Sequence, residues 1–180
     1  GVDRQLDEAK VREAARFFLD QDVEAVSIAF FNSYLNAEHE QRAAEIVREL
    51  MPKAFVSISS EILPVMGEYE RTSTAVINAF VGPKTTRYLN QLTSSLDSSG
   101  LRTPPWIMQS NGGLASAKTL VSQPVSVVLS GPAGGGAAAS YWGGLTDGKG
   151  VIFFDMGGTS TDISFTVDGS VELTDHTAIE

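Results

Sequence analysis

The chain has 180 residues, about the length of one domain or a little more, and its 42% hydrophobic and 19% charged residues are typical of a globular protein. Its formal net charge of −9 argues against a general nucleic-acid binder or a polybasic membrane binder. The absence of cysteine excludes disulfides, cysteine-based zinc sites and thiol nucleophiles, and two histidines leave little room for a histidine-rich metal site or a Ser-His-Asp triad.

The two ends of the chain indicate a segment of a longer polypeptide. The chain opens on Gly1 and Val2 without a methionine or a basic region, and it stops at Glu180 just after a strand-like stretch. We therefore expect an internal fragment with no signal peptide. The uncharged run from Thr119 to Thr146 is interrupted by prolines and glycines, so it does not predict a membrane span.

The first third of the chain predicts alternating helices and strands. Apolar residues recur at helical spacing over Asp7–Asp20, and the apolar run Val23–Phe31 suits a parallel strand buried on both faces. Asn36 can cap a following helix that Pro52 ends, and Ala54–Ser59 reads as a second strand. This order favours βαβ-type packing.

The remaining elements begin with one long helix. Glu68–Leu96 has helical spacing, with a break or kink expected at Gly82–Pro83. Its expected apolar stripe consists of Val76, Phe80, Tyr88, Leu92 and Leu96. The strands expected beyond it are Pro105–Gln109, Val125–Leu129, a buried Val151–Phe154, Ile163–Val167 and Ser170–Thr174, the last two joined by an Asp168-Gly169 hairpin turn.

The sharpest motif is the run from Asp155 to Asp162, which lies between two expected strands. Gly157 and Gly158 allow a turn with positive φ and a close approach of the backbone to a ligand, and successive N–H groups in such a turn bind anions. Thr159, Ser160 and Thr161 add hydroxyl donors, whereas Asp155 can hold a hydrated Mg²⁺ or orient a water, and Asp162 can do likewise or brace the turn. We interpret the run as a phosphate loop on a β-hairpin; an ordinary Gly-Gly turn is the alternative.

Three further segments are candidate sites, each with a purely structural alternative. In the first, Ser130 or Gly131 would cap a small-residue helix, and Gly134 and its neighbours allow close approach to a nucleotide or simply to a sheet. The second is the polar loop of Asn111, Gly112 and Gly113 at a strand end, where α/β proteins bind ligands, although a plain turn fits equally. The third is the polar helix start Glu68–Thr74, which a capped and solvated helix end also explains.

Together these segments resemble a known family. The strings VIFFDMGGTSTDISF, LSGPAGGGAAA, IMQSNGG, EYERTSTAVINAFV and FFNSYLNAEHEQRAAEI occur in the order found in the hydantoinase A / oxoprolinase family, which also includes acetone and acetophenone carboxylases. The resemblance implies an α/β fold of the actin-like ATPase (ribonuclease H-like) type, a mixed sheet flanked by helices that ends in the β-hairpin phosphate loop. It also implies that residues 1–65 end an N-terminal domain and that residues 66–180 begin the core domain.

The resemblance further implies a cytoplasmic, ATP- and Mg²⁺-dependent enzyme that hydrolyses cyclic amides of the hydantoin or oxoproline type. Asp155–Asp162 would be its second phosphate loop, with Asp155 at the metal, and a hydantoinase B-type subunit or domain would be its partner. The first phosphate loop and the adenosine site are not in this sequence, so the chain alone is expected to be inactive. Two alternatives stay open: a subunit of an ATP-dependent carboxylase, and an actin-like protein that binds ATP without metabolic turnover.

Overall fold

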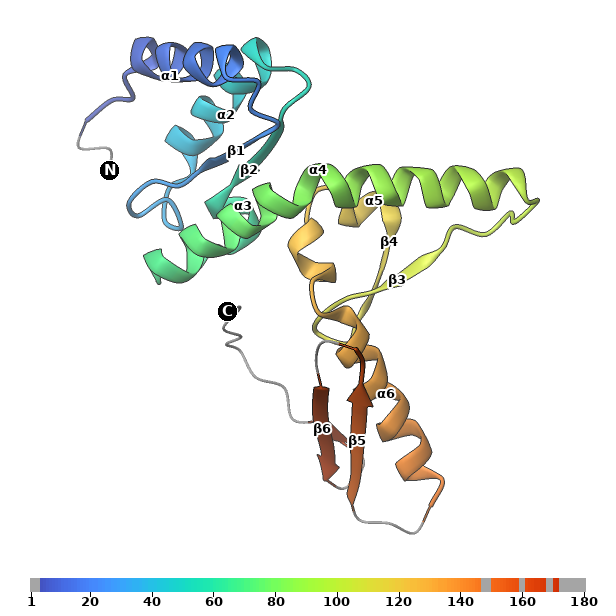
Figure 1. The fold of residues 1–180 in the computed structure, drawn as a ribbon. Helices are drawn as coiled ribbons and strands as arrows, with labels where there is room; N and C mark the ends of the chain where they lie inside the picture. Colours follow the sequence, from blue (N-terminus) through green and yellow to red (C-terminus); the bar gives the residue numbers. More distant parts are fainter. Residues whose placement is uncertain (1–3, 147–149, 159–160, 168–169, 172–180) are drawn as a thin grey trace. The chain divides into compact units, whose positions relative to one another are not determined.

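The computed structural model describes residues 4–146, 150–158, 161–167 and 170–171, and it divides the chain into two compact units (Figure 1). The first unit comprises residues 1–96 and 121–125, and the second comprises residues 97–120 and 126–180. In the described part of the chain, no helix combines the length and apolar character needed to cross a bilayer.

The first unit is built on a two-stranded parallel sheet. The strands β1 (Ala25–Ile28) and β2 (Phe55–Ile58) pair along their whole length, with Ala25 opposite Phe55 and Ile28 opposite Ile58. Helix α1 (Glu8–Asp20) precedes β1, and helix α2 (Glu38–Leu50) connects the two strands. The predicted βαβ order and parallel pairing are therefore confirmed, although β1 is shorter than the Val23–Phe31 run suggested.

Side-chain caps start both helices. The carboxylate of Asp7 accepts a hydrogen bond from the Lys10 backbone N–H at 3.2 Å, and the amide oxygen of Asn36 accepts one from the Glu38 N–H at 3.0 Å. Both bonds satisfy backbone donors that have no partner within the first turn. Helix α2 ends at Leu50, two residues before Pro52, as predicted.

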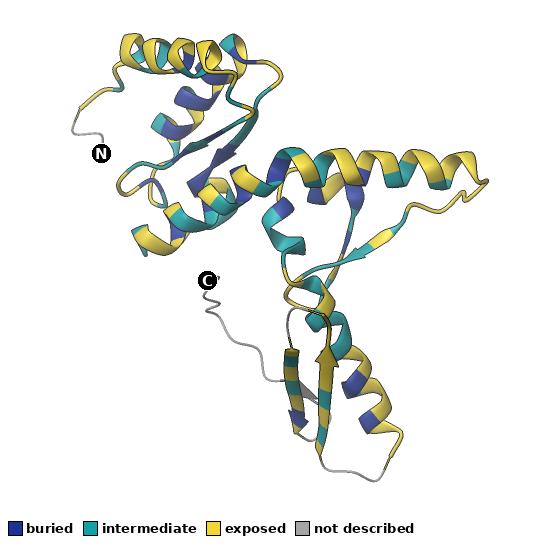
Figure 2. Cartoon of the chain, in the orientation of Figure 1, coloured by how far each residue is buried: buried dark blue, intermediate teal, exposed yellow. Residues whose placement is uncertain are grey.

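The core of this unit lies between the helices and the sheet. Figure 2 shows buried residues on β1, on β2 and along α2. The core consists mainly of aliphatic side chains: Ala15, Val26, Ile28, Ala43, Ala44, Val47, Met51 and Ile58. Alanines at two adjacent positions of α2 let this helix pack closely on the sheet.

After the short helix α3 (Ser59–Ile62), the long helix α4 (Glu68–Ser98) runs without interruption through Pro83. Of the two possibilities considered at Gly82–Pro83, the break is therefore wrong, and the kink stays a prediction. Both sides of the proline are held by packing, because Ala79, Gly82 and Leu89 are all buried. Tertiary contacts of this kind outweigh the loss of one backbone donor at the proline.

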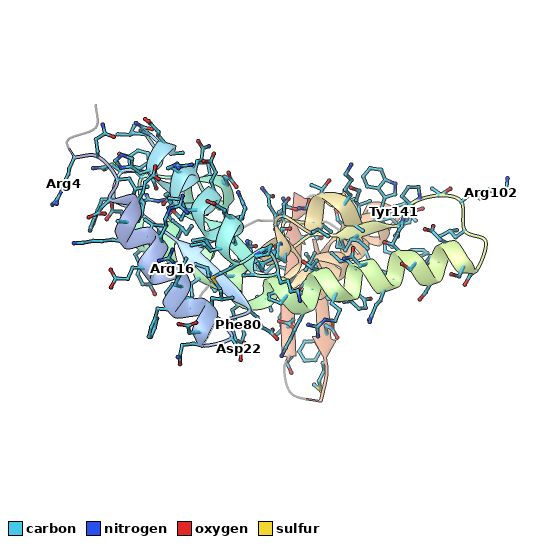
Figure 3. All side chains as sticks on the ribbon, turned by 90° about the horizontal axis from the view of Figure 1, so that it is seen from above. Arg4, Arg16, Asp22, Phe80, Arg102 and Tyr141 are labelled. Atoms are coloured by element: carbon cyan, nitrogen blue, oxygen red, sulfur yellow. The ribbon has the colours of Figure 1, made fainter. Side chains whose placement is uncertain are left out.

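The buried face of α4 differs from the expected stripe. Val76, Phe80 and Tyr88 are 50%, 80% and 60% exposed, and Phe80 is labelled on the outside of the helix in Figure 3. Helical spacing instead places Arg71, Ala75, Asn78, Gly82 and Leu89 on the buried side. The expected stripe is wrong because apolar character alone does not decide which face of α4 is buried. Arg71 and Asn78 are buried there because their polar groups have hydrogen-bond partners.

A fully buried carboxylate anchors the carboxyl ends of the two parallel strands. Glu40 on α2 is 0% exposed, and its Oε1 accepts hydrogen bonds from the Phe30 N–H at 2.7 Å and from the Ser59 hydroxyl at 2.6 Å. Its Oε2 accepts from the Ser60 N–H at 2.9 Å. Burial opposes the ionisation of Glu40, but these hydrogen bonds outweigh it and lower the pKa of this carboxyl.

Arg71 extends the same network from α4. Its side chain is 1% exposed, its Nε donates to the Ser59 hydroxyl at 3.2 Å, and its Nη1 and Nη2 donate to the carbonyls of Val65 (3.0 Å) and Phe30 (2.8 Å). The guanidinium also lies 5.6 Å from the ring centroid of Tyr34. Ser59 therefore links a buried carboxylate to a buried guanidinium.

The second unit contains two antiparallel sheets and a helix of small residues. The first sheet pairs β3 (Trp106–Met108) with β4 (Leu114–Ser116), and β4 runs into the short helix α5 (Ala117–Leu120). The second sheet has the order β5 (Gly150–Met156), β6 (Thr161–Val167), β7 (Ser170–Val171). The pairing of Val167 with Ser170 confirms the predicted second hairpin, whose Asp168-Gly169 turn lies outside the described residues.

The strand expected at Val125–Leu129 is wrong. Residues Pro124–Val127 form a 3₁₀ helix, η1, and helix α6 (Ser130–Gly144) follows. Pro124 has no N–H for a strand ladder, and the Val125 N–H donates instead to the side-chain oxygen of Asn78 at 3.0 Å. Two backbone groups of this run thus have partners outside a strand ladder, since the Ser126 carbonyl accepts from the Ser110 N–H at 2.7 Å.

Glycines on α6 allow this helix to lie directly on the β5–β6 hairpin. A Cβ added at Gly135 would overlap the ring of Phe153, and one added at Gly143 would lie 2.6 Å from Cγ2 of Val151. The close-packing interpretation of these small residues is thereby confirmed. The expectation that Val151–Phe154 is a buried strand is wrong for this chain, because Ile152 and Phe154, on the face away from α6, are 76% and 53% exposed.

We expect Gly82→Ala to destabilise the first unit by about 1–3 kcal/mol, because its Cβ would lie 2.6 Å from two ring carbons of Phe55. The matched control is Gly144→Ala in α6, where an added Cβ has no atom within 4 Å and where better helix propensity should raise stability by up to about 1 kcal/mol. Thermal unfolding of both variants measures the difference. If Gly82→Ala is as stable as Gly144→Ala, the Phe55 ring moves aside without a cost in stability, and the expected clash is contradicted.

We expect Glu40→Gln to cost about 3 kcal/mol at neutral pH, because both carboxylate oxygens accept hydrogen bonds and an amide has only one acceptor atom. Since the pKa of Glu40 lies below its usual 4.5 in the folded state, its contribution is complete above pH 4.5 and is lost as pH falls through the lowered value. Denaturant unfolding across this acid range should therefore show a weaker pH dependence in the variant. The control is Glu49→Gln, an exposed partner of Arg12 whose change should leave the pH profile intact.

Candidate functional site

The predicted phosphate loop is the tip of the β5–β6 hairpin. The register places Asp155 opposite Asp162 and Met156 opposite Thr161, so the connection contains only residues 157–160. Thr159 and Ser160 lie outside the described residues. The strand–turn–strand context proposed from the sequence for Asp155–Asp162 is therefore present in the structure.

The two aspartates lie on one face of the hairpin. Directly paired residues share a face, and alternation along β5 puts Asp155 on the same face as Phe153, the residue that packs against α6. Asp155 is exposed and Asp162 is half-buried. Two carboxylates directly opposite each other repel, and a cation held between or beside them would relieve this repulsion.

The Asp155–Asp162 pair suits Mg²⁺ better than a metal whose ligands all come from protein side chains. Among the residues that the structure describes, no group of three or more acidic or histidine side chains could enclose an ion. Mg²⁺ prefers oxygen ligands and is commonly bound by one or two carboxylates, with waters and substrate phosphates completing its shell. Asp155, with Asp162 opposite, fits that pattern.

The glycines of the tip leave space for a ligand. A Cβ added at Gly158 would meet no described atom within 4 Å, and the φ of Gly158 lies outside the left-handed region. Gly158 therefore does not adopt the positive φ that the sequence suggested. Gly157, Gly158 and Thr161 are all exposed.

The start of α6 lies at the same end of the second unit as the hairpin tip. Gly143 contacts Val151 near the beginning of β5, whereas Gly135 contacts Phe153 farther along, so α6 runs antiparallel to β5 and begins toward Asp155 (Figure 1). Ser130 and Gly131 thus lie toward the tip. The expected cap is shifted by one residue, because Leu129 precedes the helix with φ 62° and no side chain caps the first turn.

The predicted polar loop Asn111–Gly113 follows β3. A Cβ at Gly134 would lie 3.8 Å from Cγ of Met108, the last residue of β3, so this loop is next to the first turns of α6. Its polar groups, however, hold the turn itself: Asn111 Oδ1 accepts from the Gly113 N–H at 2.9 Å, and Gly112 has φ +79°. These contacts explain Asn111 and Gly112 without a ligand.

A second concave site lies in the first unit, at the carboxyl end of β1. Its volume is about 70 Å³, and its lining residues are Ala29, Phe30, Phe31, Glu68, Arg71 and Thr72. Glu68 and Arg71 belong to the polar helix start noted in the sequence. The buried partners Glu40 and Ser59 were missed there, although Glu40 shares a helical face with Ala43, Ala44 and Val47, and an acid on an apolar face is a signal of a buried polar contact.

The chain is similar over most of its length to several enzymes. It is 39% identical to the caprolactamase subunit alpha of Pseudomonas jessenii over 91% of this chain and 24% of that protein. It is 38% identical to an uncharacterised protein of Methanocaldococcus jannaschii over 95% of this chain and 25% of that protein, and 34% identical to the 5-oxoprolinase of Saccharomyces cerevisiae. The chain thus spans about a quarter of the first two relatives.

Two solved structures share its fold. The nucleotide-free acetone carboxylase structure aligns with a TM-score of 0.82 at 30% identity, covering 91% of this chain and 23% of that one. The ATP-dependent caprolactamase of Pseudomonas jessenii aligns with a TM-score of 0.81 at 38% identity, covering 92% of this chain and 24% of that one. These alignments confirm the expected α/β fold class.

The family assignment rests on two matched regions. The N-terminal region of the hydantoinase/oxoprolinase family matches residues 1–51, and the hydantoinase/oxoprolinase domain itself matches residues 71–180. The second match alone covers more than half of the chain and includes the hairpin, the start of α6 and the β3–β4 loop. The chain belongs to the hydantoinase/oxoprolinase family.

Proposed function

We propose that this chain is part of an ATP-dependent enzyme that opens cyclic amides. The observation that carries the proposal is the β5–β6 hairpin, with Asp155 opposite Asp162 and the uncapped start of α6 at the same end of the unit. The relatives named caprolactamase and 5-oxoprolinase support this substrate class. The boundary between domains at residues 65 and 66 and the cytoplasmic location stay predictions.

The residues of the second unit have distinct roles in this proposal. Asp155 holds Mg²⁺, with Asp162 as a second oxygen donor or as a brace for the turn. The N–H groups of Gly157 and Gly158 and the hydroxyls of Thr159, Ser160 and Thr161 bind phosphate oxygens. The uncapped first turn of α6, at Ser130 and Gly131, offers N–H donors and the positive end of its dipole to the same anion, and Gly134 lets neighbouring groups approach closely.

ATP bound with Mg²⁺ would supply the phosphoryl group that activates an amide carbonyl for hydrolysis. The chain's own contribution is to neutralise and orient the phosphates, since fixed donors in a preorganised site stabilise developing negative charge. Asn111, Gly112 and Gly113 lie at the edge of this region, where they support the loop or contact the nucleotide.

A partner subunit completes this proposal. Several relatives are named as subunits, among them the caprolactamase subunit alpha and the acetone carboxylase beta subunit. We propose a hydantoinase B-type subunit or domain as the partner here. A subunit of an ATP-dependent carboxylase is the second candidate, favoured by the structural similarity to acetone carboxylase. Measuring ATP-dependent consumption of cyclic amides and of ketones with bicarbonate by the full-length protein separates the two.

In the full-length enzyme, we expect Asp155→Asn to reduce MgATP-dependent turnover about 10²-fold or more, because the neutral amide no longer holds the metal. The shape is retained and Asp155 is exposed, so the melting temperature should change little. Steady-state phosphate release measures the loss, and Asp20→Asn at the exposed end of α1 is the control. Near-normal turnover in a folded variant would move the metal role to Asp162.

Gly158→Val tests the phosphate loop by shape rather than by charge. A Cβ added at Gly158 has no described atom within 4 Å and the backbone there is not left-handed, so the melting temperature should be almost unchanged. In the full-length enzyme, however, the branched side chain would occupy the space of the phosphate oxygens, and MgATP affinity should fall at least about tenfold. Calorimetric titration with MgATP measures this affinity. Unchanged affinity in the folded variant would contradict the phosphate-loop assignment.

A further inference from the structure

We infer that Asn78, a buried residue of α4, is a positioning residue for the start of α6, the turn that the proposed function places at the ATP phosphates. The inference rests on that function and adds to it a residue of the first unit. Asn78 is 0% exposed, and both ends of its carboxamide have partners. Its Nδ2 donates to the Ser57 hydroxyl at 3.1 Å, and its Oδ1 accepts from the Val125 N–H at 3.0 Å.

The bond to Val125 joins Asn78 to a segment 47 positions farther along the chain. Val125 is the second residue of η1, and its neighbour Pro124 is buried. The boundary between the two units falls inside η1, because residues 121–125 belong to the first unit and residues from 126 onward to the second. The hydrogen bond from Val125 and the burial of Pro124 therefore fix the first half of η1 within the first unit.

The second half of η1 is held by a backbone contact within the second unit. The Ser126 carbonyl accepts a hydrogen bond from the Ser110 N–H at 2.7 Å, and Ser110 comes directly before the Asn111–Gly113 loop. Hydrogen bonds inside a 3₁₀ helix have poorer geometry than those of an α-helix, so contacts to other segments matter more for holding such a turn in place. Asn78 provides one of these contacts at Val125, and Ser110 provides the next one.

The link from η1 to α6 is short, so the place of η1 determines where α6 begins. Only Val128 and Leu129 separate the end of η1 from Ser130, and successive Cα atoms are about 3.8 Å apart. Leu129 has φ 62°, a left-handed conformation that residues other than glycine adopt where the surrounding structure imposes it. Here η1 is fixed on one side of Leu129, and α6 is fixed on the other by the contact of Gly135 with Phe153.

The direction of the first N–H groups of α6 depends on this backbone alone, because no side chain caps the helix. A turn that is ordered before binding takes up an anion without a further loss of conformational entropy. Without the bond from Val125 to Asn78, η1 loses one of its fixed contacts, and the start of α6 has to be ordered by the ligand. Asn78 therefore acts on phosphate binding through Val125, without touching the nucleotide.

The test compares Asn78→Ala with Ser57→Ala in the full-length protein. Ser57→Ala is the matched control, because it removes the partner of Asn78 Nδ2 and leaves the bond from Val125 to Oδ1 in place. Both residues are buried, so both variants should have a lower melting temperature. Only Asn78→Ala should also weaken MgATP binding, by roughly tenfold, in calorimetric titrations at a temperature where all the proteins are folded.

Hydrogen exchange without ligand gives a second readout at α6 itself. The N–H groups of Gly134, Gly135 and Gly136 are the first in this helix that have intrahelical acceptors, the carbonyls of residues 130–132. We expect these amides to exchange roughly tenfold faster in Asn78→Ala than in the unmodified protein, because the start of the helix opens more often. In Ser57→Ala their exchange should be unchanged.

Asn78→Ser is a milder second variant, for use if Asn78→Ala does not fold. Its hydroxyl is too short to replace Oδ1 at Val125 but can bond to a carbonyl of the preceding turn, and the same changes are expected. The inference is overturned if a folded Asn78 variant keeps the MgATP affinity or the exchange rates of the unmodified protein, or if Ser57→Ala changes both equally. If the unmodified protein does not bind MgATP, the proposed function fails, and the exchange rates alone decide whether Asn78 positions α6.

Discussion

The first unit depends on the charged pair that Ser59 joins. Glu40 and Arg71 come from different helices and are almost completely buried, and the hydroxyl of Ser59 donates to one and accepts from the other. Buried charges are costly unless their hydrogen-bonding capacity is met, and here the carboxylate has three partners supplied by backbone and hydroxyl donors. The ends of β1 and β2 and the first turn of α4 are therefore fixed by one connected network.

This network explains why a polar helix start is buried. Apolar packing alone would hold α4 against the sheet, but it would not fix the carbonyl groups of Phe30 and Val65, to which Arg71 donates. Asn78 acts in the same way two turns later, with its amide bonded to Ser57 and to the Val125 N–H. Such directional contacts specify one arrangement of the loops, and the hollow beside Glu68 is a consequence of that arrangement.

In the second unit, close packing at glycines, and not hydrogen bonds of buried polar side chains, positions the helix on the sheet. Gly135 and Gly143 bring α6 against Phe153 and Val151, and this contact determines which end of the helix lies beside the hairpin tip. Ser130 and Gly131 reach the same end of the unit as Asp155 for this reason, although 155 − 131 = 24 positions or more separate them in the sequence. The face of the hairpin away from α6 remains apolar and exposed, with Ile152 and Phe165 paired across it.

The sequence by itself determined the local elements whose signals are short-range: the capped helix after Asp7, the stop at Pro52, the parallel strands, and the hairpin that carries Asp155 and Asp162. It also determined the family, because several motifs in a fixed order are specific even where the spacing of apolar residues does not distinguish a helix from a strand. Only the tertiary structure decided which residues are buried. The stripe of Val76, Phe80 and Tyr88 faces outward, while Glu40, Arg71 and Asn78 lie inside, because a polar group is buried wherever long-range partners meet its hydrogen bonds. Those partners come from distant segments, so no local pattern of hydrophobicity contains them.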